Sequence, residues 1–89
     1  MPSREVEIVN KLGLHLRAAA ALVQLADSFP CKVSIIRDGQ RSNGKSILSV
    51  LSLGAPLGAK IVVDTSGDKA DDALTAIVKF VGERFGEPD

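Results

Sequence analysis

Four stretches of the chain predict β-strands, because apolar and polar residues alternate along them or because a turn signal precedes them. In the first stretch Val6 and Ile8 face one side, while the neighbouring glutamates face the other. In the second stretch Val33 and Ile35 face alike, and the Asp-Gly pair that follows predicts a hairpin. The four predicted strands cover residues 4–9, 31–37, 40–43 and 60–66.

Apolar residues recur at helical spacing in three other stretches. The first predicted helix runs over Leu16–Ser28 and is stopped by Pro30. The second runs over Ser46–Leu53 and is closed by Gly54. The apolar positions are Ala19, Leu22, Val23 and Ala26 in the first helix, and Ile47, Val50 and Leu51 in the second.

The last predicted helix follows a turn at Gly67. Asp68 is the expected N-cap, and Asp71 and Asp72 fall in the first turn, beside the positive end of the helix dipole. We expect residues 82–89 to fray. The apolar positions of this helix are Ala70, Ala73, Leu74, Ile77 and Val81.

The predicted elements follow one another in the order β-α-β-β-α-β-α. Strands that are apolar on one face suit a four-stranded antiparallel sheet with three helices packed on one face. A chain of 89 residues is expected to form one domain, 1–89, of the α/β (α+β) class.

Composition and charge narrow the functional classes. Apolar residues make up 45% of the chain, which argues against disorder. The 11 basic residues balance 11 acidic ones, so no nucleic-acid partner is expected, because duplex binding draws on a cationic surface. One cysteine cannot form an internal disulfide, and no segment reaches the roughly 20 apolar residues of a membrane helix. We therefore expect a cytoplasmic protein without membrane insertion, and its small, neutral surface favours a monomer.

The stretch GLHLRAAA, residues 13–20, contains the only histidine. His15 stands where the first loop meets the first predicted helix, whose first turn leaves N–H groups unpaired. An uncharged imidazole there offers a nitrogen lone pair as a nucleophile, and a phosphoryl group built on it would meet those N–H donors. Arg17 is close enough to pair with phosphate oxygens, and Gly13 allows a tight turn beside them.

Less specific interpretations of His15 also fit. A lone histidine near a helix start is commonly a polar surface residue. No second histidine supports a metal site, and no Ser-His-Asp spacing supports a hydrolase. Three Phe and no Tyr or Trp leave an RNA-binding domain without a stacking platform. A small regulatory module that binds a ligand or a protein, with His15 incidental, remains the alternative.

Two separated motifs resemble one family. NKLGLHLRAAA, residues 10–20, resembles the active-site motif of HPr, the histidine-containing phosphocarrier of the bacterial phosphoenolpyruvate-dependent sugar phosphotransferase system. GKSILSVLSLGAPLGAKI, residues 44–61, resembles that family's second signature, around its regulatory serine. The predicted order of elements is similar to the family's open-faced β-sandwich, so the resemblance covers nearly the whole chain.

The resemblance implies a phosphoryl carrier that is not itself an enzyme and needs no cofactor. His15 would take the phosphoryl group on Nδ1 from a phosphohistidine of enzyme I and pass it to an enzyme IIA domain, while Arg17 steadies the charge. Ser46 would be modified by a bifunctional HPr kinase/phosphorylase where the organism has one. Ser46 also suits a compatible structural role, because serine is a good N-cap for the second helix.

The resemblance also implies that partners dock on the first two helices. The expected contact residues are Leu16, Gln24, Ile47, Leu48 and Leu51.

Two residues depart from the family's usual pattern. Ala18 stands where proline is usual, which gives up a fixed φ and adds an N–H donor. Leu16 replaces a smaller residue and makes the rim of the predicted site more apolar. The sugar-transport branch and the nitrogen-type regulatory branch of the family both stay open.

Overall fold

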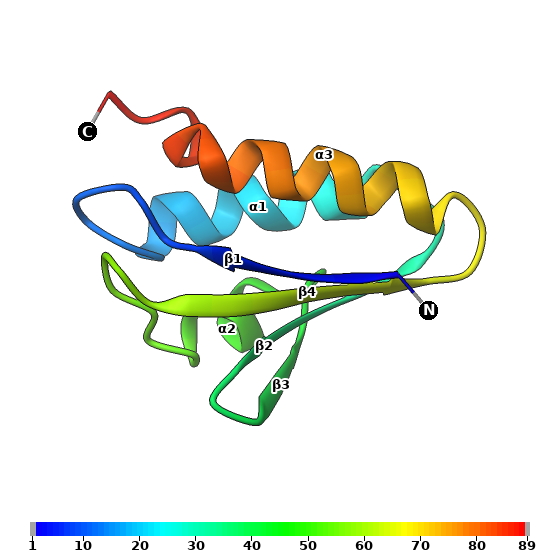
Figure 1. Cartoon of the computed structure of the whole chain (residues 1–89), viewed down its shortest axis with the longest axis horizontal. Coiled ribbons are helices and arrows are strands. Elements are labelled where there is room, and N and C mark those ends of the chain that lie inside the picture. The colour runs from blue at the N-terminus through cyan, green and yellow to red at the C-terminus, as the bar shows by residue number, and fades with distance from the viewer. Residues whose placement is uncertain (1, 89) are drawn as a thin grey trace.

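A four-stranded antiparallel sheet forms one layer of the molecule (Figure 1). The computed structural model describes residues 2–88. The strands lie in the order β1-β4-β2-β3, each antiparallel to its neighbours. Their bounds are β1 Ser3–Glu7, β2 Lys32–Arg37, β3 Gln40–Asn43 and β4 Lys60–Ser66. The predicted antiparallel sheet is confirmed.

One face of the sheet is apolar and packs against helices. Val33 and Ile35 of β2 are buried, as are Ile61 and Val63 of β4. Ile35 lies opposite Val63 in the β2–β4 register, and apolar pairs of this kind stabilise a sheet. Intervening residues such as Lys32 are exposed on the other face, so the alternation seen in the sequence separates core from solvent.

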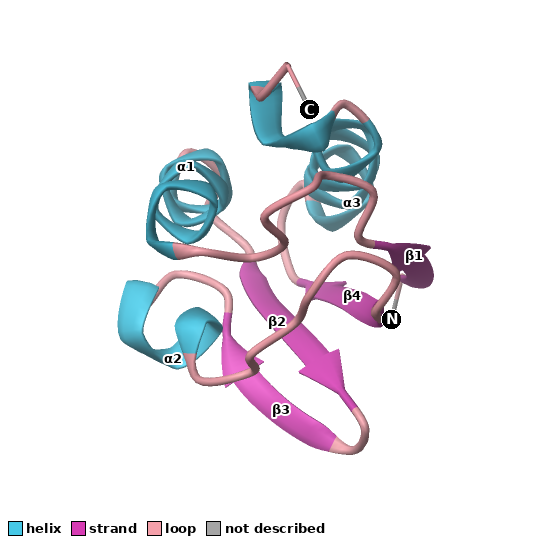
Figure 2. Ribbon diagram, turned by 90° about the vertical axis from the view of Figure 1, so that its left-hand side faces the viewer, coloured by secondary structure: helices cyan, strands magenta, loops and turns pink. Residues whose placement is uncertain are grey.

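Three helices cover the apolar face. Helices α1 (Leu16–Asp27) and α3 (Ala70–Gly82) lie side by side, while α2 (Ile47–Leu51) lies next to β3 and contacts α1 (Figure 2). Their apolar positions meet those of the sheet in one continuous core. The largest fully buried apolar side chains are Ile8, Leu22, Ile35, Val50, Ile61, Val63, Ile77 and Val81.

Strand β1 ends at Glu7, two residues before the alternation predicts. Ile8 nevertheless belongs to the core and is fully buried, and its backbone bonds to a loop instead of a strand. Its N–H donates to the carbonyl of Ala59 at 2.8 Å, and its own carbonyl accepts from the N–H of Gly58 at 2.8 Å. The loop that follows β1 is thereby attached to the loop that precedes β4.

The N-cap predicted at Asp68 is wrong. Lys69 precedes α3 in a left-handed conformation, φ 61°, and makes no side-chain cap. The chain turns tightly there, with the N–H of Ala70 donating to the carbonyl of Gly67 at 3.2 Å. Asp71 and Asp72 do lie in the first turn, where their charges favour the positive end of the dipole.

The expectation that residues 82–89 fray is also wrong for the part that the structure describes. Arg84–Gly86 forms a short 3₁₀ helix, η1. Phe85 within it is only 5% exposed, and its ring meets Phe80 edge to face with 5.7 Å between centroids. Burial of an aromatic side chain offsets the entropy lost when a few residues become ordered.

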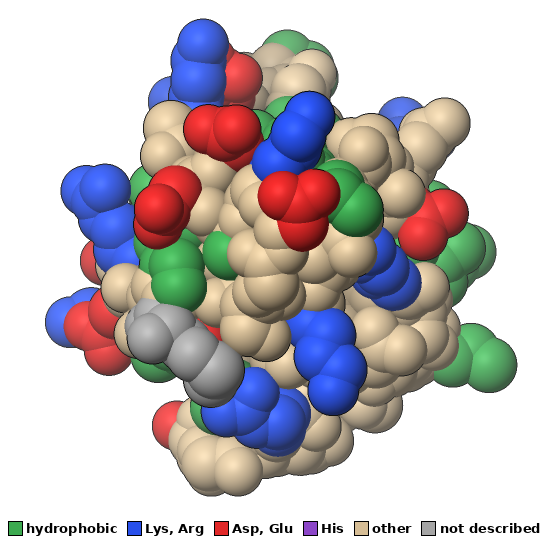
Figure 3. Space-filling model, turned by 90° about the vertical axis from the view of Figure 1, so that its right-hand side faces the viewer, with side chains coloured by type: hydrophobic (Ala, Val, Ile, Leu, Met, Phe, Trp, Pro, Cys, Tyr) green, Lys and Arg blue, Asp and Glu red, His purple; other side chains and the backbone are tan. Residues whose placement is uncertain are grey.

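The surface at the end of the molecule opposite the loop after β1 carries charges of both signs. Acidic and basic side chains are interspersed on it, and no imidazole is in view (Figure 3). Among residues 2–88 no helix combines the length and the apolar character needed to cross a membrane.

Candidate functional site

The loop that carries the histidine packs closely on the loop that precedes β4. Gly13 has φ +70°, in the region that favours glycine. A Cβ there would lie 2.7 Å from the carbonyl oxygen of Ala55 and 2.8 Å from Cα of Pro56. The N–H of Leu14 donates to the same Ala55 carbonyl at 2.8 Å. Glycine at position 13 is therefore required for the approach of two backbones that sets the direction in which the chain enters α1.

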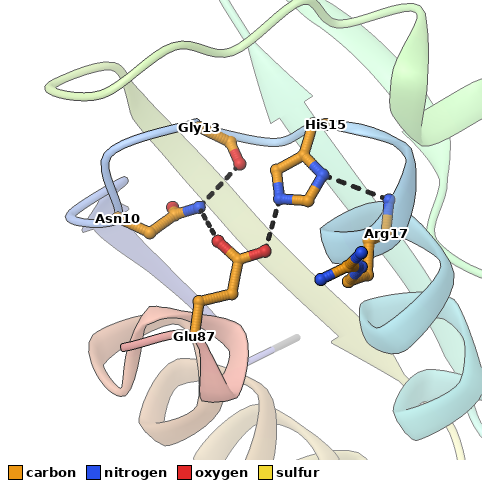
Figure 4. Close-up of polar contacts among 5 residues, drawn as sticks. All are labelled: Asn10, Gly13, His15, Arg17 and Glu87. Atoms are coloured by element: carbon orange, nitrogen blue, oxygen red, sulfur yellow. Dashed lines mark hydrogen bonds and ion pairs between the residues drawn. The ribbon is translucent and has the colours of Figure 1, made fainter. Parts of the chain in front are cut away.

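His15 is the N-cap of α1 and is held at both ring nitrogens (Figure 4). Nδ1 accepts a hydrogen bond from the backbone N–H of Arg17 at 3.2 Å. Nε2 contacts Oε2 of Glu87. A carboxylate only accepts, so these two contacts assign the proton to Nε2 and the lone pair to Nδ1.

The lone pair of Nδ1 points at the positive end of α1. An N-cap bond of this kind contributes about 1 kcal/mol, so an incoming group displaces it at small cost. A phosphoryl group on Nδ1 would present its oxygens to the unpaired N–H groups of the first turn. The His15 side chain is 26% exposed, which leaves it accessible to another protein.

Asn10 holds the carboxylate that faces the imidazole. Its Nδ2 donates to Oε1 of Glu87 and to the carbonyl of Gly13, both at 2.8 Å. The pKa of the Glu87 carboxyl is lowered chiefly by the Asn10 hydrogen bond. The hydrogen bond from His15 and the charges of His15 and Arg17 lower this pKa further, against an opposing effect of burial. Glu87 is therefore an anion at neutral pH.

A hollow of about 320 Å³ opens beside Arg17 and Glu87. It is lined by Lys11, Leu12, Arg17, Glu87 and Pro88. The side chain of Arg17 is exposed and lies on the same side of the loop as Glu87 (Figure 4). A guanidinium at this position can pair with phosphate oxygens. Arg17 thus lies beside His15, where the sequence analysis expects it.

The two helices expected to dock partners, α1 and α2, carry exposed apolar side chains. Leu16 is 63% exposed and Leu48 is 80% exposed. Ile47 and Gln24 are also exposed, whereas Leu51 packs partly against the core and offers less surface than expected. Four of the five expected docking residues are therefore exposed.

Ser46 is the N-cap of α2, as predicted. Its Oγ accepts a hydrogen bond from the N–H of Ser49 at 3.4 Å. Nζ of the neighbouring Lys45 donates to the carbonyl of Phe29 at 2.6 Å, just beyond the end of α1. Ser46 is half-buried, so its hydroxyl remains partly accessible.

Sequence reasoning missed Asn10 and Glu87. The contact between their side chains joins residues 77 positions apart, and no local pattern indicates it. The one indication in the sequence was Phe85, a large apolar residue beyond the last predicted helix, whose burial would bring the following residues back onto the fold. Among residues 2–88 no cluster of three or more His, Cys, Asp or Glu side chains could hold a metal ion.

Comparison with known proteins identifies the family. The family model described as the PTS HPr component phosphorylation site matches residues 2–83. The chain belongs to the HPr family. It is 43% identical to the phosphocarrier protein HPr of Pseudomonas aeruginosa over 88 residues, 98% of each chain. It is 39% identical to the phosphocarrier protein NPr of Shewanella violacea over 84 residues, 94% of this chain and 92% of that one.

The fold of the HPr family agrees with the structure. The crystal structure of HPr-C-His from Thermoanaerobacter tengcongensis superposes with a TM-score of 0.95 at 36% identity, over the whole of both chains. HPr proteins are phosphocarriers of the phosphotransferase system and not catalytic enzymes. The protein is therefore a phosphocarrier built on the open-faced sandwich of four antiparallel strands and three helices that the sequence analysis expects.

Proposed function

We propose that His15 carries the phosphoryl group, receives it from phosphorylated enzyme I and passes it to an enzyme IIA domain. The observation that most supports this role is the lone pair of Nδ1 at the N-terminus of α1, with Arg17 beside it. The motif at residues 10–20 and membership of the HPr family support the same assignment.

The site would promote transfer by placing the imidazole and by neutralising the charge of the phosphoryl group. Phosphoryl transfer depends mainly on alignment of the reacting groups and on neutralisation of the phosphoryl charge. Once Nδ1 is phosphorylated, the N–H of Arg17 is free to bond a phosphoryl oxygen, and the Arg17 guanidinium can bond a second. An accessible imidazole with few fixed contacts holds the group without trapping it, which suits a carrier.

Phosphorylation by phosphoenolpyruvate and enzyme I tests the role of His15. We expect the protein to gain an acid-labile, alkali-stable phosphoryl group, and His15→Asn to gain none. Asparagine keeps an N-cap acceptor for α1, so the variant removes the nucleophile and leaves the cap. Labelling of His15→Asn at the parent's rate would show that the phosphoryl group resides elsewhere. Parallel reactions with enzyme I of the sugar and nitrogen systems compare the two branches.

Ser46 is the second phosphorylation site that we propose, in an organism with an HPr kinase/phosphorylase. A phosphate at an N-cap is tolerated by the helix and adds about −1.5 to −2 charges beside the docking helices. We expect the kinase and ATP to produce an acid-stable adduct that Ser46→Ala lacks and Ser49→Ala retains. Normal acceptance from enzyme I by Ser46→Asp would contradict inhibition by charge.

The exposed side chains of α1 and α2 would dock both partners in turn. Leu16, Gln24, Ile47 and Leu48 would supply most of this surface, with a smaller part from Leu51. A carrier must release its partners quickly, which a small, transient interface allows.

We propose that the protein works in the cytoplasm and as a monomer. One chain supplies every residue of the site, which supports the monomer. Sedimentation of the unphosphorylated protein checks the oligomeric state.

A further inference from the structure

Glu87 connects two side chains from the opposite end of the chain. Oε2 contacts Nε2 of His15, 72 residues away in sequence, and Oε1 accepts from Nδ2 of Asn10, 77 residues away (Figure 4). The Glu87 side chain is only 15% exposed. One carboxylate thus uses both oxygens, one on the loop after β1 and one on the ring that carries the reacting nitrogen.

The backbone before Glu87 is held in an unusual conformation. Arg84 and Phe85 have φ of 60° and 54°, and Gly86 has φ of 78°. Non-glycine residues keep a positive φ only where the surrounding structure enforces it, and such backbone conformations are common at functional sites. The buried ring of Phe85, packed against Phe80, provides that constraint. The turn it fixes brings Glu87 back over the start of α1.

The position of Asn10 leaves its side-chain oxygen, Oδ1, without a hydrogen-bond partner among residues 2–88. The residue is fully buried. Burial of an unpaired polar atom is unfavourable. Both N–H groups of its amide are nevertheless used, one on Gly13 and one on Glu87. Asn10 therefore connects the turn before His15 to the carboxylate behind it.

We propose that Glu87 is a positioning residue, which holds the His15 imidazole in one orientation with its proton on Nε2 and so keeps the lone pair on Nδ1. The proposal rests on the proposed function of His15 as phosphoryl carrier. Asn10 and the Phe85 turn aim Glu87, and Glu87 acts only through the imidazole.

With the proton kept on Nε2, neither transfer step moves a proton on this ring. In acceptance, the Nδ1 lone pair forms the new N–P bond, and the electron pair of the broken bond stays with the donor nitrogen. The ring becomes an Nδ1-phosphoryl imidazolium that still carries its Nε2 proton, and the Glu87 carboxylate faces its positive charge. In donation, the N–P electron pair returns to Nδ1 and restores the starting tautomer.

Ring ¹⁵N NMR of His15 is the direct test, because it reports which nitrogen carries the proton. We expect the uncharged imidazole of the parent to show a protonated Nε2 and an unprotonated Nδ1, with ring proton exchange slowed by the carboxylate. Glu87→Ala should show mixed tautomers and faster exchange. Glu87→Gln, which keeps one acceptor oxygen and loses the charge, should fall between them. Glu83→Ala is the matched control, since Glu83 is exposed and lies on the same segment.

Transfer kinetics with enzyme I provide a second readout. We expect Glu87→Ala to lower kcat about tenfold, the equivalent of one charge-assisted hydrogen bond, with KM nearly unchanged because Glu87 does not dock the partner. Unchanged tautomer and kcat in a folded Glu87→Ala protein would overturn the proposal while the carrier role stands. A change in KM alone would also overturn it. Absence of a phosphoryl group on His15 in the parent would instead overturn the proposed function.

Discussion

Single residues around His15 have separable tasks. His15 supplies the lone pair, and Arg17 supplies a backbone N–H and a guanidinium. Glu87 accepts a hydrogen bond from Nε2–H of His15, and Gly13 allows the loop to approach its neighbour. Ala18 is buried at 1% exposure in the first turn of α1, and nothing in the structure explains why it stands where proline is usual in the family.

The carboxyl of Glu87 should make stability depend on acid pH. Its pKa is lowered in the folded protein, with Asn10 the largest cause. The folded state therefore binds this proton less readily than the unfolded state, and the stabilisation is present above the ordinary pKa of 4.5 and lost as pH falls through the lowered one. The titratable and charged groups facing it are the His15 ring, Arg17 and Lys11.

A carboxyl ¹³C titration checks this expectation. The midpoint of Glu87 should lie below 4.5 in the parent and rise toward 4.5 in Asn10→Ala, which lacks the largest cause. A midpoint at or above 4.5 in the parent would contradict the hydrogen bonding described for this carboxyl.

Gly13→Ala should destabilise the loop that carries His15. The new methyl would lie 2.7 Å from the Ala55 carbonyl oxygen, at a φ that alanine rarely adopts. We expect a loss of about 2 kcal/mol in urea unfolding and slower phosphoryl acceptance. Gly39→Ala is the control, because Gly39 has φ +81° but nothing within 4 Å of the new Cβ. Equal losses in the two variants would show that strain alone, and not the approach of the loops, requires Gly13.

Among the elements, α1 positions the site and η1 completes it. The first turn of α1 supplies the N–H donors, and its N-cap is His15, the proposed phosphoryl carrier. η1 is only three residues long and depends on Phe85 for its place in the fold. Strand β1 contributes to the site through the loop that follows it. Ile8, at the start of that loop, is hydrogen-bonded to the loop before β4.

We expect Phe85→Ala to detach η1 from the core and make it more mobile. Loss of a buried aromatic ring is expected to lower the free energy of unfolding by about 3 kcal/mol and to speed amide hydrogen exchange at residues 84–87. Phe85→Leu keeps most of the apolar volume and should lose about half as much. Unchanged exchange at 84–87 in Phe85→Ala would show that Phe85 does not anchor this turn.

At the scale of the whole molecule, the site lies where two loops and η1 meet at one end of the sheet (Figure 1). Leu16 directly follows His15, and α2, which carries Leu48, contacts α1. The opposite end of the molecule carries charges of both signs (Figure 3). The arrangement allows a partner to contact the imidazole and the apolar surface at once. It also leaves the other face of the sheet uncovered.

Leu48→Ser should weaken docking without weakening the fold. Leu48 is 80% exposed, so its replacement should change the free energy of unfolding by less than about 0.5 kcal/mol. We expect KM for transfer from enzyme I to rise about tenfold, as for loss of an interface anchor. Leu57→Ser, at a position 55% exposed outside the predicted docking residues, is the control. An unchanged KM in Leu48→Ser would show that α2 does not dock enzyme I.

Local sequence determined the strands, the helices, the N-cap at Ser46 and the placement of His15 before α1, because periodicity and capping depend on residues a few positions apart. The tertiary structure alone decided that Asn10, His15 and Glu87 meet, and that Lys69 and not Asp68 precedes α3. Contacts between residues more than 70 positions apart exist only once the core has formed and the ring of Phe85 is buried in it. For that reason the proposed nucleophile, His15, was visible in the sequence, and the Glu87 carboxylate that contacts its ring was not.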